Sequence, residues 1–226
     1  MINDLKLGFK LLKYSMQFKM SIIVSCLFIL IGIIFDSTSL SRMNPVISIY
    51  YLFGMVFASQ LVSNLNASQM VQSSPYKKCL QTRIMTGICV CIELITTTMM
   101  LVIKVVQYYG KEDMRIHIID SILIVSISVL LFNLYMIMAT KFYWSATIVF
   151  VLAVAIGVGI ITKWKFEMLF PGGELAILPQ LSFFTAVVIC YGAILLGGIL
   201  MYVISNLLYK REYSKMMFKT ALERAK

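Results

Sequence analysis

The chain contains few charged residues and none of the short motifs that mark common catalytic sites. Asp, Glu, Lys and Arg make up 13% of its 226 residues, about half the share found in a soluble domain. It has no hydrolytic triad, zinc signature, dinucleotide fingerprint or GxxxxGK[ST] phosphate loop, since Gly110-Lys111 lacks both the upstream glycine and the following hydroxyl. We therefore expect a chain that is not an enzyme and does not hydrolyse ATP by itself.

Cysteine and histidine are arranged in a way that does not favour a metal site. The five cysteines include no CxxC pair, and the single histidine, His117, is far from them in the sequence. We expect the cysteines to pack against neighbouring helices. The first apolar run lacks the small-x-small site of a cleaved signal peptide. The chain also has no internal repeat of the kind that builds many secondary transporters.

Apolar residues dominate what is present. They make up 60% of the chain, and the mean hydropathy is +0.90. Water cannot accommodate so much apolar surface, so the sequence predicts an all-α integral membrane protein, a single domain over residues 1–226. The net charge of +10 does not indicate nucleic acid here, because the basic residues stand in short segments beside apolar runs, which is a topology signal.

Six transmembrane helices are predicted, each near the roughly twenty residues needed to cross a hydrocarbon core. Their expected ranges are Met20 to Phe35, Val46 to Leu65, Ile84 to Val106, Ile118 to Ala139, Tyr143 to Thr162 and Phe183 to Leu208. The first is short unless it extends back toward Phe18.

The distribution of Lys and Arg predicts that both termini are cytoplasmic. With the N-terminus inside, fourteen of these residues are on the inner side and six on the outer side. The outer six are Arg42, Lys104, Lys111, Arg115, Lys163 and Lys165.

Residues 2–18 show a helical period, with lysines on one face and Leu5, Phe9, Leu12 and Met16 on another. A basic amphipathic helix of this kind lies in the headgroup layer and leads into the first span. Its lysines are Lys6, Lys10 and Lys13. The alternative is a loosely held cytoplasmic tail.

The segment 68–83 is a polar and basic interruption between the second and third spans. We interpret it as a loop followed by a short cytoplasmic helix, capped by Ser73 or Ser74 and with Pro75 at its first position. We expect Tyr76, Cys79 and Leu80 to form an apolar side, and a wet side to hold Lys77, Lys78, Gln81 and Arg83. The alternative is an ordinary positively charged inner loop that only orients the chain.

Two further segments differ from simple loops. Residues 166–181 are too apolar for a free outer loop and are broken by Pro171 and Pro179. We expect a hairpin of short re-entrant or interfacial helices, buried in protein or lining a wet cavity. Residues 209–226 form a basic tail expected to continue the last span as a cytoplasmic helix, where it could touch a partner or anionic lipid.

Polar and small residues inside the spans suggest three further sites. Glu93 is expected near the middle of the bilayer. It could be a proton or cation site, or its carboxyl could form hydrogen bonds with nearby hydroxyls such as those of Thr96 or Thr97. The second span carries a polar stripe, which could line a substrate cavity or bond neighbouring helices. Small residues in the fifth span permit close helix approach across a subunit interface. The stripe is Ser59, Gln60, Ser63 and Asn64; the small residues are Ala153, Ala155, Gly157 and Gly159.

Near the outer surface, we expect Lys104 to extend toward water, where it could pair with Asp120.

Taken together, the interfacial elbow helix, the six spans, the Ser-Ser-Pro-Tyr-Lys-Lys segment and the Pro-containing hairpin resemble the permease subunits of ABC-2-type exporters. The resemblance covers the whole chain but is architectural. It implies the type V exporter fold and identifies Ser73 to Lys78 and Gln81 with the family's coupling-helix region. The absence of a large outer domain is unlike the lipid- and sterol-transporting members.

The resemblance implies a homodimer of permeases with two separate ATPase subunits, which bind ATP and Mg, in a bacterial plasma membrane. Small members of this type export amphipathic peptides and toxins, and we expect hydrophobic or amphipathic solutes to be the cargo. Two other functions stay open from the sequence. One is an ion- or proton-coupled carrier that uses Glu93, and the other is a membrane accessory protein that transports nothing.

Overall fold

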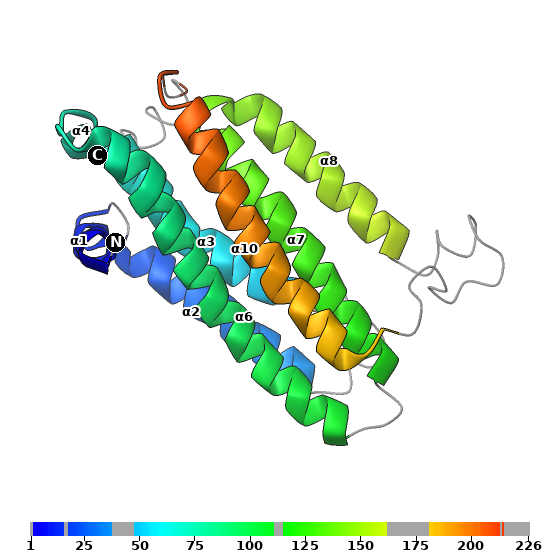
Figure 1. The fold of residues 1–226 in the computed structure, drawn as a ribbon. Coiled ribbons are helices and arrows are strands. Elements are labelled where there is room, and N and C mark those ends of the chain that lie inside the picture. The colour runs from blue at the N-terminus through cyan, green and yellow to red at the C-terminus, as the bar shows by residue number, and fades with distance from the viewer. Residues whose placement is uncertain are drawn as a thin grey trace.

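The computed structural model describes residues 2–15, 18–37, 48–110, 115–161, 181–212 and 214. Within these ranges the fold is all-helical. Six long helices lie at the six predicted positions: α2 (Phe18–Ser37), α3 (Ile49–Ala67), α6 (Met85–Gly110), α7 (Arg115–Lys141), α8 (Tyr143–Ile161) and α10 (Phe183–Leu207). They run side by side in one bundle, and each is antiparallel to the one before it (Figure 1).

Four segments of the described chain are long and apolar enough to cross a membrane, namely Phe18–Asp36, Lys77–Gly110, Ile118–Lys141 and Phe183–Leu207. A shorter apolar helix runs from Tyr143 to Ala153. The C-terminal half of α3 carries several Ser, Asn and Gln residues, and α3 is not among the four. These segments indicate a protein embedded in a membrane.

The middle of the bundle is formed by α3, α6, α7 and α10, whose mutual contacts bury large apolar side chains such as Met55, Ile88, Phe132 and Ile194. Helix α2 packs on the outside of α3, and α8 on the outside of α7. The α2–α3 contact is close because Gly54 has no side chain. A Cβ there would lie 2.7 Å from the Ile29 side chain, and the Ser25 hydroxyl donates to the Gly54 carbonyl at 2.7 Å.

The outward faces of these helices stay apolar. Side chains such as Leu27 on α2, Val102 on α6, Val149 on α8 and Ile199 on α10 are more than half exposed. In water this surface would be unstable, whereas lipid chains or a second protein can cover it.

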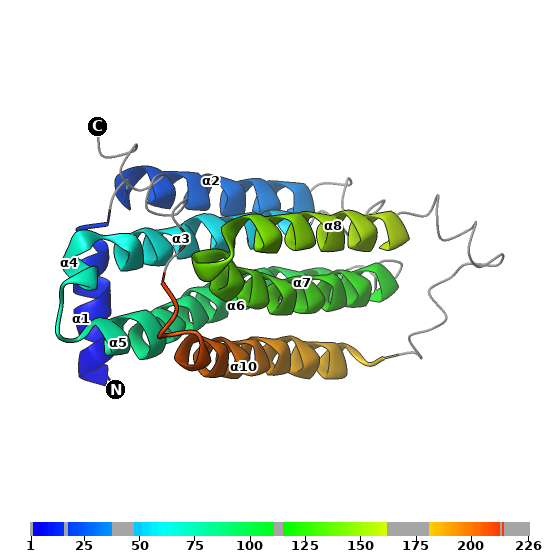
Figure 2. The ribbon, with the colours of Figure 1, turned by 90° about the horizontal axis from the view of Figure 1, so that it is seen from above.

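Helix α1 (Ile2–Leu12) lies across one end of the bundle, nearly perpendicular to the long helices (Figure 2). Its buried side fits closely against the start of α6. A Cβ on Gly8 would approach Ile84 to 2.5 Å, and Leu5 is the side chain nearest to Gly87. The Ser15 hydroxyl, just after α1, donates to the Leu61 carbonyl of α3 at 2.9 Å. The alternative of a loosely held tail is wrong for this helix.

The apolar face of α1 differs from the predicted one in one respect. Leu12 is buried as expected, but Phe9 and Leu7 are exposed, and Gly8 takes a place on the buried side. The protein-facing side is therefore narrower than the predicted apolar face.

Several predicted boundaries shift. The first long helix does begin at Phe18 and continues to Ser37, so Asp36 is helical although the predicted span ends at Phe35. Helix α7 begins at Arg115, three residues before its predicted start. The predicted hairpin 166–181 lies outside the described residues except for Leu181, and so does most of the tail 209–226.

Candidate functional site

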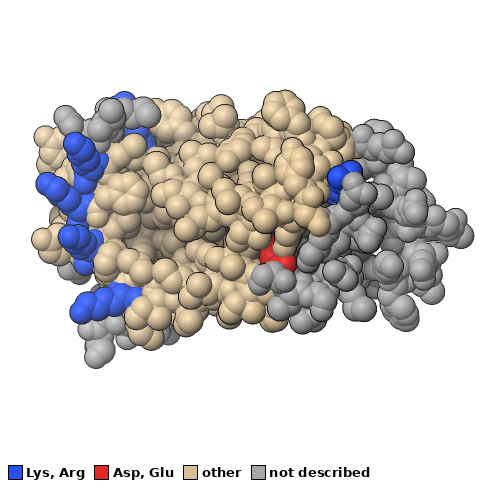
Figure 3. Space-filling view, turned by 90° about the horizontal axis from the view of Figure 1, so that it is seen from below, with Lys and Arg blue, Asp and Glu red and all other residues tan. Residues whose placement is uncertain are grey.

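Basic side chains are concentrated at the end of the bundle where α1 crosses. Twelve Lys and Arg side chains belong to described residues. Ten stand at this end: Lys6, Lys10, Lys13, Lys19, Lys77, Lys78, Arg83, Lys141, Lys210 and Arg211. The other two, Lys104 and Arg115, stand near the opposite end. We call the first end the basic end. Figure 3 shows this asymmetry on one face of the molecule, with a band of uncharged residues beside the basic end.

The segment between α3 and α6 is at the basic end and contains two single helical turns. Helix α4 (Gln69–Gln72) directly follows α3, and the Ser68 hydroxyl accepts from the Val71 N–H at 3.4 Å. The chain then turns through Ser73 and Pro75 into α5 (Lys77–Cys79). Of the two predicted capping residues, Ser74 is the one whose hydroxyl accepts a nearby N–H, that of Tyr76 at 3.1 Å.

The second turn is not the separate short helix that we predicted. Helix α5 runs through a π-helical turn, η3 (Leu80–Ile84), directly into α6. The basic residues therefore sit on the first turn of a long continuous helix. A π-turn accommodates one extra residue and often marks a functional position in a helix.

The predicted coupling residues differ in how far their side chains are exposed. Tyr76 is 71% exposed, and Ser73, Pro75 and Lys78 are exposed as well. Gln81 was predicted on the wet side, and this is wrong: it is 5% exposed and faces the bundle. The reason is the helical geometry of η3, which turns Gln81 inward with Leu80 and Thr82 while Arg83 stays in contact with water.

The polar stripe of α3 divides between two faces. Ser59 and Ser63, one helical turn apart, are buried in the bundle, whereas Gln60 is exposed and Asn64 is partly exposed. The same outer face of α3 carries Phe53 and Phe57.

These two aromatic residues of α3 belong to a small cluster with Phe28 of α2. The ring centroids of Phe28 and Phe57 are 5.2 Å apart and stacked, and those of Phe28 and Phe53 are 5.5 Å apart. Gln60 and the rings thus form one accessible face, with the amide nearer the basic end of the bundle and the aromatic groups farther from it.

Glu93 is fully buried in the middle of the bundle, and its partner is an amide. The Asn133 Nδ2 group of α7 donates to Glu93 Oε2 at 3.0 Å. The predicted partners are wrong: the Thr96 hydroxyl donates to the Ile92 carbonyl, and the buried Thr97 hydroxyl has no hydrogen-bond partner in the structure. Glu93 Oε1 and Asn133 Oδ1 also lack hydrogen-bond partners.

Helix α10 closes over this pair through a glycine. A Cβ on Gly197 would lie 2.5 Å from Asn133 Nδ2, so only a residue without a side chain leaves space for the amide. The Glu93–Asn133 bond therefore joins α6 to α7 directly beneath α10.

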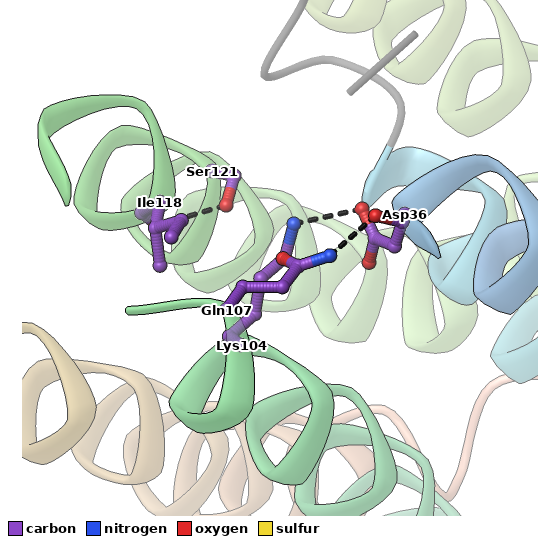
Figure 4. A network of polar contacts seen from close by, with 5 residues as sticks. All are labelled: Asp36, Lys104, Gln107, Ile118 and Ser121. Carbon is purple, nitrogen blue, oxygen red and sulfur yellow. Dashed lines mark hydrogen bonds and ion pairs between the residues drawn. The ribbon is translucent and has the colours of Figure 1, made fainter. Parts of the chain in front are cut away.

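Lys104 does not extend to the outer surface, and the expected pairing with Asp120 is replaced by another. Its Nζ atom forms an ion pair with Asp36 Oδ1 at 2.8 Å, and both side chains are almost fully buried. Gln107 Nε2 donates to the backbone carbonyl of Asp36 (Figure 4). The end of α2 is thus tied to α6 by two side chains one turn apart.

The small residues of the fifth span lie on α8 as predicted. Ala153 is partly buried. The side-chain surroundings of Ala155, Gly157 and Gly159 are outside the described part of the structure.

Sequence reasoning did not identify Asn133 or Asp36 as structurally important. Asn133 could have been noticed, because it is a single amide side chain within an apolar run, and another span holds a single carboxyl, Glu93. Asp36 gave no comparable indication.

Among the described residues, no group of three or more His, Cys, Asp and Glu side chains could hold a metal ion. Comparison of the chain with protein-family models, with curated proteins and with solved structures finds no match. Function is therefore inferred from the chain itself.

Proposed function

We propose that this protein is the membrane permease subunit of an ATP-driven exporter of the ABC-2 type, with six transmembrane helices and both termini in the cytoplasm. The observation that carries the proposal is the turn formed by Tyr76, Lys77 and Lys78 at the basic end, in which Tyr76 and Lys78 are exposed and Lys77 is half-buried. It joins two long helices and stands beside a helix that crosses the end of the bundle. An ATPase subunit that binds this turn would act directly on α6.

The contacts of α1 support a role in transmitting such a movement. Through Gly8 and Ser15 it touches the start of α6 and the inner half of α3, the two helices that the basic segment connects. A displacement of the segment cannot leave α1 unaffected, because its contacts with Ile84 and Ile88 are too close for independent sliding. Its lysines Lys6, Lys10 and Lys13 are exposed and can face lipid headgroups.

The solute path is proposed along the outer face of α3. An amide such as Gln60 is unfavourable against lipid chains unless another polar group meets it. A solute with apolar and polar parts could satisfy Gln60 and Asn64 while its apolar part contacts Phe53 and Phe57. Amphipathic peptides have this character and are the proposed cargo.

In this proposal two copies of the chain form a homodimer through the small residues of α8, in a bacterial plasma membrane. Two ATPase subunits bind ATP and Mg and supply the free energy. The permease binds the solute and alternates its access without doing covalent chemistry.

Co-purification tests the first step. The chain is co-expressed with a candidate ABC ATPase subunit, and the complex is isolated through a tag on the ATPase. We expect Lys77→Glu together with Lys78→Glu to remove the permease from the eluate. Lys13→Glu together with Lys19→Glu makes the same charge change at the same end and should leave the complex intact. If both double variants co-purify as well as the original chain, the basic turn is not the docking element.

A further inference from the structure

The buried pair of Glu93 and Asn133 has two polar atoms that the proposed export function does not explain. Both side chains have an exposed fraction of 0%. They share one hydrogen bond, from Asn133 Nδ2 to Glu93 Oε2 at 3.0 Å. The other oxygen of each group, Glu93 Oε1 and Asn133 Oδ1, has no hydrogen-bond partner in the structure. Buried oxygens normally accept a hydrogen bond, so the pair lacks a donor.

The neighbouring hydroxyls do not supply this donor. Thr97 lies one turn after Glu93 on α6, and Ser59 of α3 neighbours the Cys89 thiol one turn before it. Both hydroxyls are buried, and both are themselves without a hydrogen-bond partner. The donor that remains is the carboxyl itself, which carries an O–H group when it is protonated.

No cation neutralises Glu93 within the described part of the chain, where the structure records no ion pair for it. Lys104 is on the same helix but lies about 16 Å further along it, and it is paired with Asp36. The Cys89 thiol is the titratable side chain that the structure places beside Glu93, and neither of its forms is positive. A buried carboxylate without a cation is far more costly than a neutral carboxyl hydrogen-bonded to an amide.

We propose that Glu93 is held as a neutral carboxylic acid at neutral pH and that its Oε1–H group donates to Asn133 Oδ1. The acid and the amide then exchange two hydrogen bonds, one in each direction, and no oxygen of the pair is left without a partner. The bound proton is a second link between α6 and α7, beneath Gly197 of α10. This state of Glu93 depends neither on an ATPase nor on a solute.

Infrared spectroscopy of the full-length chain in lipid at neutral pH tests the proposal, because a carboxylic acid and a carboxylate absorb at different frequencies. We expect the original chain to show the C=O band of a protonated carboxyl and Glu93→Gln to lack it. Glutamine is neutral and has nearly the same shape, so this variant should fold. Labelling the side-chain carboxyl of glutamate with a heavy carbon isotope should shift the same band in the original chain, which assigns it to a glutamate without any substitution.

Two further variants examine the hydrogen bond and the other buried carboxyl. Asn133→Leu removes the amide but keeps a side chain of similar volume, and we expect the band to move to higher frequency because the carboxyl loses its hydrogen bonds. The matched control is the double variant Asp36→Asn with Lys104→Met. It removes a buried carboxyl that is paired with a cation, and it should leave the band unchanged.

Three results would overturn the proposal. A band that is absent from the original chain, or equally strong in Glu93→Gln, would mean that Glu93 is a carboxylate. A band that is lost in the Asp36 double variant and kept in Glu93→Gln would assign the proton to Asp36. A band that does not move in Asn133→Leu would mean that the acid does not bond the amide. None of these results bears on the export function, which the co-purification experiment tests separately.

Discussion

The Nζ atom of Lys104 on α6 lies 2.8 Å from Oδ1 of Asp36 on α2, and both side chains are buried at the end of the bundle opposite α1. The pair connects a helix of the middle of the bundle to the outer helix α2, which otherwise packs mainly on α3. Gln107 adds a bond to the Asp36 carbonyl, and the Asp36 carboxylate also interacts electrostatically with the buried Tyr51 phenol. This contact fixes α2 at its C-terminal end.

Removing the cation should therefore be costly. Lys104→Met removes the buried cation that pairs with the Asp36 carboxylate, and we expect a loss of about 3–5 kcal/mol in stability. Thermal unfolding in detergent measures the effect. The double variant Lys104→Met with Asp36→Asn removes both charges and should recover most of the loss. If the double variant is as unstable as the single one, the ion pair is not what holds α2.

The space over Asn133 should admit only glycine. Gly197→Ala places a Cβ 2.5 Å from Asn133 Nδ2 and forces the amide away from Glu93, at a cost of about 1–3 kcal/mol. Gly192→Ala is the control on the same helix, since a Cβ there meets nothing within 4 Å, and it should be neutral or slightly stabilising. Comparable unfolding temperatures for the two variants would contradict the described packing.

Glu93 should act as a packing residue. Glu93→Gln keeps an acceptor for Asn133 and should change stability little, whereas Glu93→Leu leaves a buried amide without its partner and should cost about 1–3 kcal/mol. Transport in proteoliposomes decides between the two roles of this residue. We expect Glu93→Gln to transport normally without an imposed proton gradient. A folded Glu93→Gln protein that has lost transport would favour the ion-coupled carrier.

The exposed face of α3 should determine what is transported. Gln60→Leu makes this face wholly apolar, and we expect at least a severalfold loss of peptide-stimulated transport with no loss of stability, because Gln60 is exposed and buries nothing. Ser63→Ala changes the buried face of the same helix and should affect solute stimulation little. If Gln60→Leu leaves peptide-stimulated transport unchanged, the exposed face of α3 is not the solute path.

The long helices were predictable because their signal is local. An apolar run of about twenty residues bounded by polar or basic residues has few alternatives to a membrane helix. The observed helix ends differ from the predicted ones where a polar residue is part of the helix, as Asp36 is in α2 and Arg115 is in α7. In both cases a tertiary contact favours the helix: the Lys104 ion pair for Asp36, and a packing contact of Arg115 with the Tyr108 ring at 5.3 Å.

The partners of polar residues were not predictable, because they depend on which helices meet. Lys104 was matched with Asp120 because both were expected near the outer surface of the membrane, yet the fold brings α2 beside α6, and Lys104 pairs with Asp36. Glu93 was matched with threonines of its own helix, but the Thr96 hydroxyl donates to the Ile92 carbonyl and the Thr97 hydroxyl has no hydrogen-bond partner in the structure. Gln81 was placed in water because its neighbours are basic, and the π-turn directs it inward.

ATP turnover in lipid tests the central claim most directly. The chain is reconstituted with its candidate ATPase, and turnover is compared for the original pair, for the variant carrying Lys77→Glu and Lys78→Glu, and for the control carrying Lys13→Glu and Lys19→Glu. The export proposal predicts that the original and control chains alter turnover in response to amphipathic peptide and that the first variant does not. Turnover that is the same with and without the permease, or a peptide response that survives in the first variant, would contradict it.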